Sequence, residues 1–158
     1  MCAVLCVSAQ DSLRFGWLSY ETALMSMPQY AVVQKQMEDL RAQYQAETKR
    51  VEEEFNRKYE EFLEGQREFP KTILQKRQTE LQELMEKNIA FKEEGRQELA
   101  AAEEEMTAPI KTSLSETIAK IAKERGLAFV LNTDSNACPF IDPTMGEDIN
   151  TLVQDALK

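Results

Sequence analysis

The chain has 158 residues, a length that suits one domain, and 30% of them are charged. Its 28 acidic and 19 basic residues give a net charge of −9, which argues against nucleic acid as a partner because neutralising phosphates requires a basic surface. There is no histidine, the commonest general base and metal ligand. No stretch approaches the roughly 20 apolar residues of a membrane span, so we expect no integral membrane segment.

Residues 1–9 form an apolar run that ends in Ser8-Ala9, before polar Gln10-Asp11. This order is similar to the end of a secretory signal peptide, although the run is short and lacks the basic leading region. We therefore expect residues 1–9 to be a signal remnant, from a start codon placed too far downstream; an ordinary apolar N-terminus is the other interpretation. Cys2 and Cys6 lie in this run, so a processed chain would keep Cys138 alone, which we expect to be a buried structural thiol.

The next elements are short. Residues 13–18, "LRFGWL", alternate as a strand does, with Phe15 and Trp17 on one face and Gly16 and Leu18 on the other. Ser19 is a suitable cap for a helix of one or two turns that ends before Pro28.

A long helical hairpin is predicted for residues 28–109. Apolar residues recur there every three or four positions, as in a coiled coil, on both sides of a turn at Gly65–Lys71. Gly95 lowers the regularity of the second helix, and Pro109 is expected to kink or restart it. The first stripe is Tyr30, Val33, Met37, Leu40, Tyr44, Val51, Phe55, Tyr59 and Phe62; the second is Leu74, Leu81, Leu84, Asn88, Phe91, Leu99, Ala102, Met106, Ile110, Leu114, Ile118 and Ile121.

After the hairpin the chain returns to short elements. Gly126 should end the helix, and Leu127–Leu131 predicts a strand with Leu127, Phe129 and Leu131 on one face. "NTDSN" is typical of a turn, "CPFI" (residues 138–141) predicts a second short strand, and Asn150 is expected to cap a last helix.

These elements predict an α+β fold that is mostly helical. Residues 10–27 and 110–158 would form a small β-containing body, with the antiparallel hairpin inserted between its strands. Three strands of about five residues are marginal alone, so we expect subunits to join their sheets. The predicted oligomer core is Phe15, Trp17, Leu127, Phe129 and Leu131.

Three segments resemble the Skp/OmpH family of periplasmic chaperones. They are Arg14–Tyr30 "RFGWLSYETALMSMPQY", Ile118–Asp134 "IAKIAKERGLAFVLNTD" and Phe140–Lys158 "FIDPTMGEDINTLVQDALK". Ser19 stands where the family usually has Asp. The resemblance implies a homotrimer, in which a trimeric β-barrel body holds helical tentacles around unfolded outer-membrane proteins.

Two functions are weighed. The resemblance implies an ATP-independent periplasmic holdase for unfolded outer-membrane proteins. The five glycines form no phosphate-binding loop and no histidine is present to activate Cys138, so we expect no catalytic residue, cofactor or metal. The alternative is a structural coiled-coil spacer or adaptor of the cell envelope. Candidate client contacts on the hairpin are the aromatics Tyr44, Phe55, Tyr59, Phe62 and Phe69, for which packing within the hairpin is the other interpretation. The hairpin carries 13 basic and 19 acidic residues between Pro28 and Ala108, a net of −6.

Overall fold

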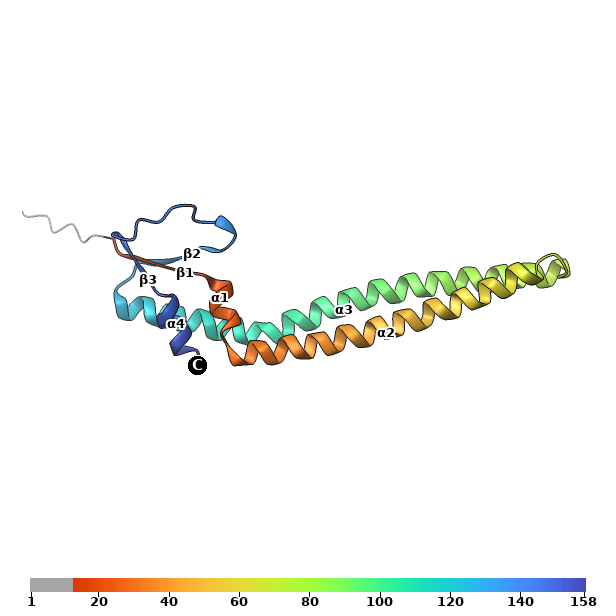
Figure 1. The fold of residues 1–158 in the computed structure, drawn as a ribbon, viewed down its shortest axis with the longest axis horizontal. Coiled ribbons are helices and arrows are strands. Elements are labelled where there is room, and N and C mark those ends of the chain that lie inside the picture. Colours follow the sequence, from red (N-terminus) through yellow and green to blue (C-terminus); the bar gives the residue numbers. More distant parts are fainter. Residues whose placement is uncertain (1–12) are drawn as a thin grey trace, which may run out of the picture. The chain divides into compact units, whose positions relative to one another are not determined.

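The elements follow one another in a strand–helix–strand order. The computed structural model describes residues 13–158, so the expectation of a signal remnant at residues 1–9 lies outside the described residues. The elements are β1 (Phe15–Leu18), α1 (Tyr20–Met25), α2 (Pro28–Gly65), α3 (Lys71–Arg125), β2 (Phe129–Asn132), a 3-10 turn (Asp134–Asn136), β3 (Gly146–Asp148) and α4 (Asn150–Ala156) (Figure 1).

The described chain divides into two units. The first, here called the body, comprises Ala108–Lys158 and the described residues up to Ala31; the second, here called the hairpin, comprises Val32–Thr107. All three strands belong to the body, and β1 precedes both long helices in the sequence whereas β2 and β3 follow them.

The body contains one three-stranded sheet of order β2-β1-β3. Both pairings are parallel, with Phe15 opposite Phe129 on one side and opposite Gly146 on the other. Parallel neighbours cannot be joined by a tight turn and need a long connection. Here the connection from β1 to β2 contains α1, α2 and α3.

Two strand predictions need correction. Residues 138–141 are not a strand: Pro139 has no N–H to donate to a ladder, and Phe140 is 80% exposed. The third strand is instead Gly146–Asp148, whose polar sequence has no alternation and is specified by its pairing with β1. The strand predicted at Leu127–Leu131 begins two residues later, at Phe129.

The prediction that Cys138 is a buried thiol also needs correction, because its side chain is half-buried.

The body core lies on the side of the sheet that carries Gly16 and Leu18. A Cβ added to Gly16 would lie 2.8 Å from Leu127 Cδ1 and 3.5 Å from Ile149 Cγ2, so glycine lets these side chains approach the strand. Burial of each such side chain contributes about 1.5–3 kcal/mol. The buried apolar residues of this unit are Leu18, Ala23, Met27, Ile110, Leu114, Ile121, Leu127, Ile149, Val153 and Leu157.

Side chains from the far end of the chain cap α1. As predicted, Ser19 Oγ accepts from the N–H of Thr22 at 3.1 Å. The Ser19 hydroxyl donates to Asp134 Oδ1 at 2.6 Å, and the N–H of Glu21 donates to Asp134 Oδ2 at 2.8 Å. These bonds hold the pKa of Asp134 below its ordinary value. A carboxylate here also suits the positive end of a helix.

Asn150 does not cap α4, contrary to expectation. Its side-chain oxygen accepts from the N–H of Ser19 at 2.9 Å, and its own N–H donates to Asp148 Oδ1 at 2.9 Å. The residue therefore ties the start of α4 to the end of β1. The predicted cap failed because the competing donor, Ser19, lies 131 residues away in the sequence.

The two long helices begin and end near the predicted residues. A turn of residues 66–70 joins α2 to α3. The prediction that Gly126 ends α3 is confirmed: its φ is +65°, and the N–H of Leu127 returns to the carbonyl of Ala122 at 2.8 Å. α3 does not restart at Pro109. The proline removes one hydrogen bond, and those on either side keep the helix continuous.

Candidate functional site

Two kinds of site are not found among residues 13–158. No group of three or more Cys, Asp or Glu side chains is placed to hold a metal ion there. Within the same residues, no helix has the length and apolar content to cross a membrane. The candidate sites are therefore surfaces, one in the body and one in the hairpin.

The body exposes an aromatic face on the sheet side opposite its core, here called the aromatic face (Phe15, Trp17 and Phe129). The rings of Phe15 and Phe129 stack at 5.6 Å and 6°, and Trp17 lies 6.2 Å from Phe15. Phe15 and Trp17 are half-buried, and Phe129 is 43% exposed. A Cβ on Gly146 would lie 2.6–2.8 Å from the rings of Phe15 and Trp17, so glycine makes room for them. Three rings thus form one apolar layer that this chain covers only in part.

The predicted oligomer core divides between the two sides of the sheet. Leu131 pairs with Trp17 and is half-buried, so it lies with the aromatic face. Leu127 does not, because it precedes β2 and packs against Gly16 in the core of its own chain, 9% exposed. The prediction that Leu127 and Phe129 share one strand face is wrong. The strand begins at Phe129, so the alternation of side chains between its two faces does not apply to Leu127.

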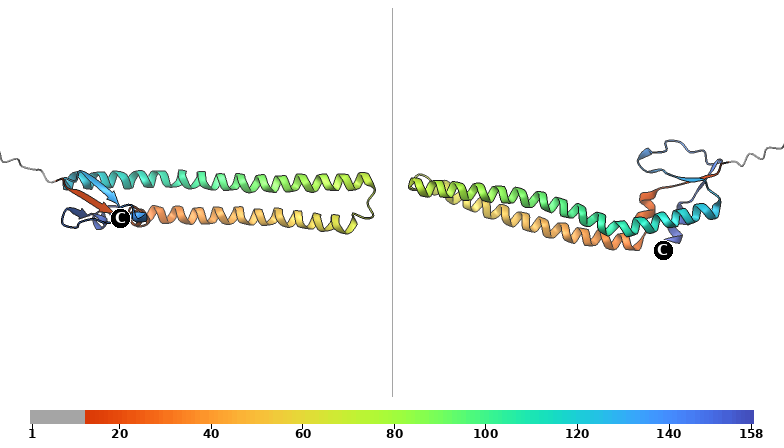
Figure 2. Two further views of the ribbon diagram at one scale, coloured as in Figure 1. Left: turned by 90° about the horizontal axis from the view of Figure 1, so that it is seen from above. Right: turned by 180° about the vertical axis from the view of Figure 1, so that it is seen from behind.

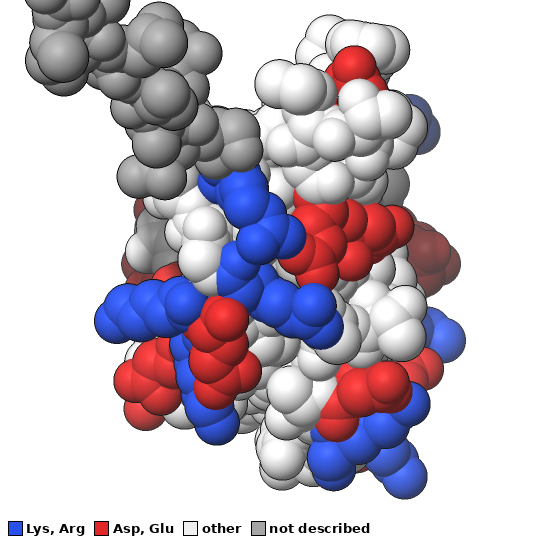
Figure 3. All heavy atoms as spheres, turned by 90° about the vertical axis from the view of Figure 1, so that its left-hand side faces the viewer, with Lys and Arg blue, Asp and Glu red and all other residues white. Residues whose placement is uncertain are grey.

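The edge of the body beside β3 carries paired charges. Arg14 and Arg125 both contact the carboxylate of Glu147, at 3.2 and 3.1 Å. Arg14 also donates to the carbonyl of Arg125 at 3.1 Å. In Figure 3 the basic side chains of this end of the molecule lie among acidic ones. The surface is mixed rather than a basic patch.

In the hairpin, α2 and α3 run antiparallel and side by side (Figures 1 and 2). Arg41 pairs with Glu103 at 2.7 Å, and Lys92 pairs with Glu52. Asn88 donates from Nδ2 to the carbonyl of Val51 at 3.0 Å. A polar residue that bonds across a helical seam fixes register, because sliding the helices leaves it unsatisfied.

Tyr44 packs closely against α3 in the hairpin. A Cβ on Gly95 would lie 2.8 Å from Tyr44 Cδ1, and the Tyr44 hydroxyl donates to Glu98. The bond to Glu98 raises the pKa of Tyr44 above its ordinary value. Tyr44 also stacks obliquely on Phe91 at 6.1 Å. Gly95 is therefore a contact point between the helices, although from the sequence it looks like a weak point.

Of the five aromatic candidates, Tyr59 is covered least. Phe55 and Tyr59 stack at 6.0 Å and 6°, and Tyr59 is 45% exposed although it belongs to the apolar stripe. Tyr44, Phe55, Phe62 and Phe69 are half-buried. The ring of Phe69 lies against Gly65 at the turn. Packing and exposure therefore coexist in these side chains.

Sequence reasoning missed two exposed apolar residues on α3. Met85 is 47% exposed and Ile89 is 61% exposed. They line a hollow of about 340 Å³ together with Glu52, Phe55, Asn56, Asn88 and Lys92. Their four-residue spacing beside the stripe, one helical turn apart, was the available signal.

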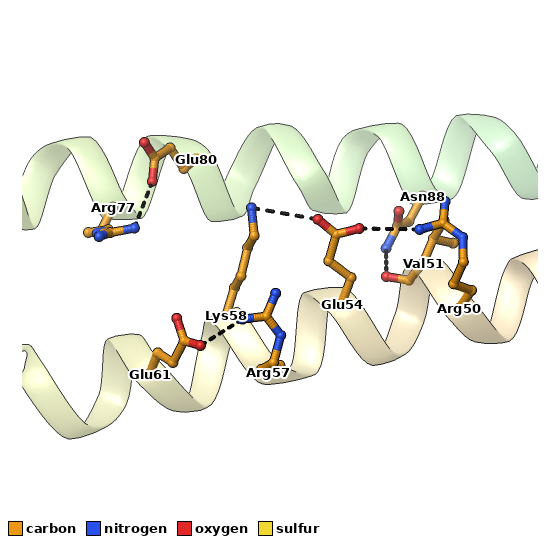
Figure 4. Close-up of polar contacts among 9 residues, drawn as sticks. All are labelled: Arg50, Val51, Glu54, Arg57, Lys58, Glu61, Arg77, Glu80 and Asn88. Carbon is orange, nitrogen blue, oxygen red and sulfur yellow. Dashed lines mark hydrogen bonds and ion pairs between the residues drawn. The ribbon is translucent and has the colours of Figure 1, made fainter.

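Ion pairs cover much of the rest of the hairpin (Figure 4). Glu54 lies between Arg50 and Lys58, 3.7 Å from each, and Arg57 contacts Glu61 at 2.8 Å. On α3, hydrogen bonds from Arg96 and Gln97 lower the pKa of Glu93 to about 2. The pKa of Glu47 is lowered in the same way by Arg50. These pairs neutralise charge locally although the hairpin is acidic in total.

The arrangement agrees with one known family. The family model described as outer membrane protein (OmpH-like) matches residues 14–157. The curated proteins gave no match to the chain. The matched range covers nearly the whole chain, from the start of the sheet to the last helix, with the long helices between them. This chain belongs to the OmpH-like family.

Proposed function

We propose that this protein is an ATP-independent holdase of the periplasm that keeps unfolded outer-membrane proteins from aggregating. The observation that carries the proposal is the match to the OmpH-like family, a family of periplasmic chaperones that bind outer-membrane proteins. The exposed apolar side chains of the hairpin support it, since a holdase must cover apolar segments of its client.

The physical basis is a balance of weak contacts. A ligand that binds the unfolded state holds it in solution by mass action, and this requires no hydrolysis. Tyr59, Met85 and Ile89 offer exposed apolar surface, and Met85 and Ile89 line an open hollow. Methionine in particular adapts to irregular partners. Such a surface suits clients that share apolar character but no single sequence.

We further propose that three copies assemble through the aromatic face of the body. The sheet has three strands of three or four residues, and Phe15, Trp17 and Phe129 are only partly covered by their own chain. Small sheets of this kind gain stability when neighbouring subunits cover them. Light scattering after gel filtration should give about three times the mass of one chain.

The test of the holdase is a dilution experiment. A urea-unfolded outer-membrane β-barrel protein is diluted into buffer with and without this protein, in the absence of nucleotide, and turbidity is followed. The expected result is suppression of aggregation at a ratio of one trimer to one client. A structural spacer, the alternative function, would leave aggregation unchanged, and that outcome would overturn the proposal.

Changing the salt concentration distinguishes the two forces that act between the hairpin and a client, which are charge interactions and apolar contacts. Because the hairpin has a net charge of −6, it repels an acidic client, and salt screens that repulsion over a Debye length of about 8 Å at physiological ionic strength. Apolar contacts are unchanged or slightly strengthened. Raising salt from about 20 to 300 mM should therefore keep or improve affinity for an acidic client. Strong weakening would mean that basic side chains such as Lys49 and Arg50 dominate instead.

A further inference from the structure

The two sides of the hairpin differ in chemistry. One carries Phe55, Tyr59, Met85 and Ile89, and is here called the apolar side. The other carries the ion pairs of Arg50, Glu54 and Lys58 drawn in Figure 4. Glu52 and Glu54 point different ways, because two residues turn an α-helix by about 200°.

The apolar side is hollowed, and its charged groups are already paired, whereas the exposed side chain of Asn56 adds one uncharged polar group to the lining. Phe55, Met85 and Ile89 line the hollow of about 340 Å³. Among its other lining residues, the ammonium of Lys92 contacts the carboxylate of Glu52, and Asn88 is bonded to the carbonyl of Val51. A charged group entering the hollow would have to compete with a formed pair. The fitting occupant is therefore uncharged and mainly apolar.

The size of the hollow limits what enters it. An apolar cavity of about 150 Å³ accepts one benzene ring, so 340 Å³ has room for about two large side chains. The open shape allows a chain to enter from the side. A segment with two neighbouring apolar side chains on one face fits this volume, whereas a folded domain does not.

A second copy of the hairpin is a poorer occupant. The four large side chains of the apolar side are each partly exposed. If one whole side chain has a surface of about 150–250 Å², the four together expose about 400 Å². A stable interface buries roughly 800 Å² on each partner. The apolar side is too small for a permanent contact and suits one that forms and breaks.

We infer that the apolar side of the hairpin is the docking surface for client segments, and that the hollow between Phe55, Met85 and Ile89 takes their large apolar side chains. This inference rests on the proposed holdase function. The ion-pair side then serves solubility and contributes little to client affinity.

Matched substitutions of two isoleucines on α3 test the inference. Ile89 and Ile73 are 61% and 43% exposed, and only Ile89 lines the hollow. Ile89→Gln should weaken binding of a fluorescent, urea-unfolded outer-membrane β-barrel protein about tenfold, the loss expected when a buried apolar side chain becomes polar. Ile73→Gln should change binding less than twofold. Gln is a good helix former, so helix content should be kept, and circular dichroism checks this.

A crosslinking arm leaves the binding surface almost intact. A photoreactive phenylalanine analogue replaces Ile89 in one variant and Ile73 in another, and the yield of client crosslinks is compared. We expect a several-fold higher yield at position 89. Equal yields, or equal affinities of the two Gln variants, would overturn the inference while leaving the holdase in place. A parent protein that binds no client would overturn the holdase, and the inference with it.

Discussion

The body and the hairpin are stabilised in different ways. In the body Ala23, Leu114, Ile149 and Val153 are fully buried. In the hairpin Val33 and Met37 are the buried apolar residues among those described, and the rest of the stripe is half-covered or exposed. Two helices can cover each other on one side only, so register there depends on Asn88 and on pairs such as Arg41–Glu103. A well-buried unit is suited to hold its shape, and a thinly covered one to adapt to a partner.

The largest effect is expected at the aromatic face. Phe129→Asp should prevent assembly, because covering a charge by neighbouring subunits costs several kcal/mol. Phe129 is 43% exposed in one chain, so the chain itself should still fold. Light scattering should report a monomer whose helix content is normal by circular dichroism.

Phe129→Tyr is the control for this substitution. It keeps the ring that stacks on Phe15 and should keep the assembly. A trimer that survives Phe129→Asp would mean that the subunits meet elsewhere and that the aromatic face has another use.

The next effect compares the two cores directly. Ile149→Ala should cost about 2–5 kcal/mol, because Ile149 is fully buried and a cavity would remain. Leu84→Ala, in the half-buried stripe of α3, should cost about 1 kcal/mol, since less surface is lost there. Urea unfolding measures both. Trp17 is the single tryptophan, so its fluorescence reports on the body while circular dichroism reports mainly on the helices. Equal losses would show that the hairpin core is as tightly packed as the body core.

A smaller effect tests the close contact in the hairpin. Alanine is favoured over glycine inside a helix by roughly 0.5–1 kcal/mol. At Gly95 the added Cβ would meet the Tyr44 ring at 2.8 Å, so Gly95→Ala should bring no gain in the parent. In a Tyr44→Ser background the ring is gone, and the same substitution should raise the free energy of unfolding by about 1 kcal/mol. The same effect in both backgrounds would show that the ring moves aside at no cost.

Local patterns predicted much of this fold. The Ser19 cap, the turn near Gly65 and the end of α3 at Gly126 depend on residues close in the sequence, and all were found as expected. The misses depend on distant partners. β3 exists because Gly146 pairs with Phe15, and Asn150 is turned to Ser19 by a bond across the chain. Periodicity shows none of these pairings.

The candidate surfaces were predicted only in part, because they also depend on pairing and packing between residues that are distant in the sequence. Alternation placed Phe15 and Trp17 on one face, but the side of Leu127 depends on where β2 begins, which pairing decides. On the hairpin the apolar stripe identified Phe55 and Tyr59. The exposure of Met85 and Ile89 beside it depends on how the helices are rotated about their axes, which the sequence alone leaves open.

The smallest effect on stability is expected from lowering the pH. Two carboxylates contribute to this effect, and added salt should distinguish their contributions. Glu93 has its pKa lowered to about 2 by Arg96 and Gln97, and the Ser19 hydroxyl and the Glu21 N–H lower that of Asp134. Both pKa values are lower in the folded state. Their stabilising contributions are therefore complete above the ordinary carboxyl range near pH 4 and are lost as the pH falls toward the folded values.

The partners of the two carboxylates differ in charge. Glu93 faces an arginine of its own helix, so about 0.5 M salt should weaken its contribution by screening. Asp134 accepts from uncharged donors 113 and 115 residues away, so salt should leave its contribution intact.

Between pH 5 and pH 2, Trp17 fluorescence should follow the release of α1 in the body, and Asp134→Asn should remove that step at any salt concentration. Arg96→Gln should reduce the acid response of the helix signal at low salt, whereas Arg67→Gln, whose arginine makes no ion pair within residues 13–158, should not. A salt-sensitive step in the body would mean that a charged group, and not the α1 cap, responds to acid there.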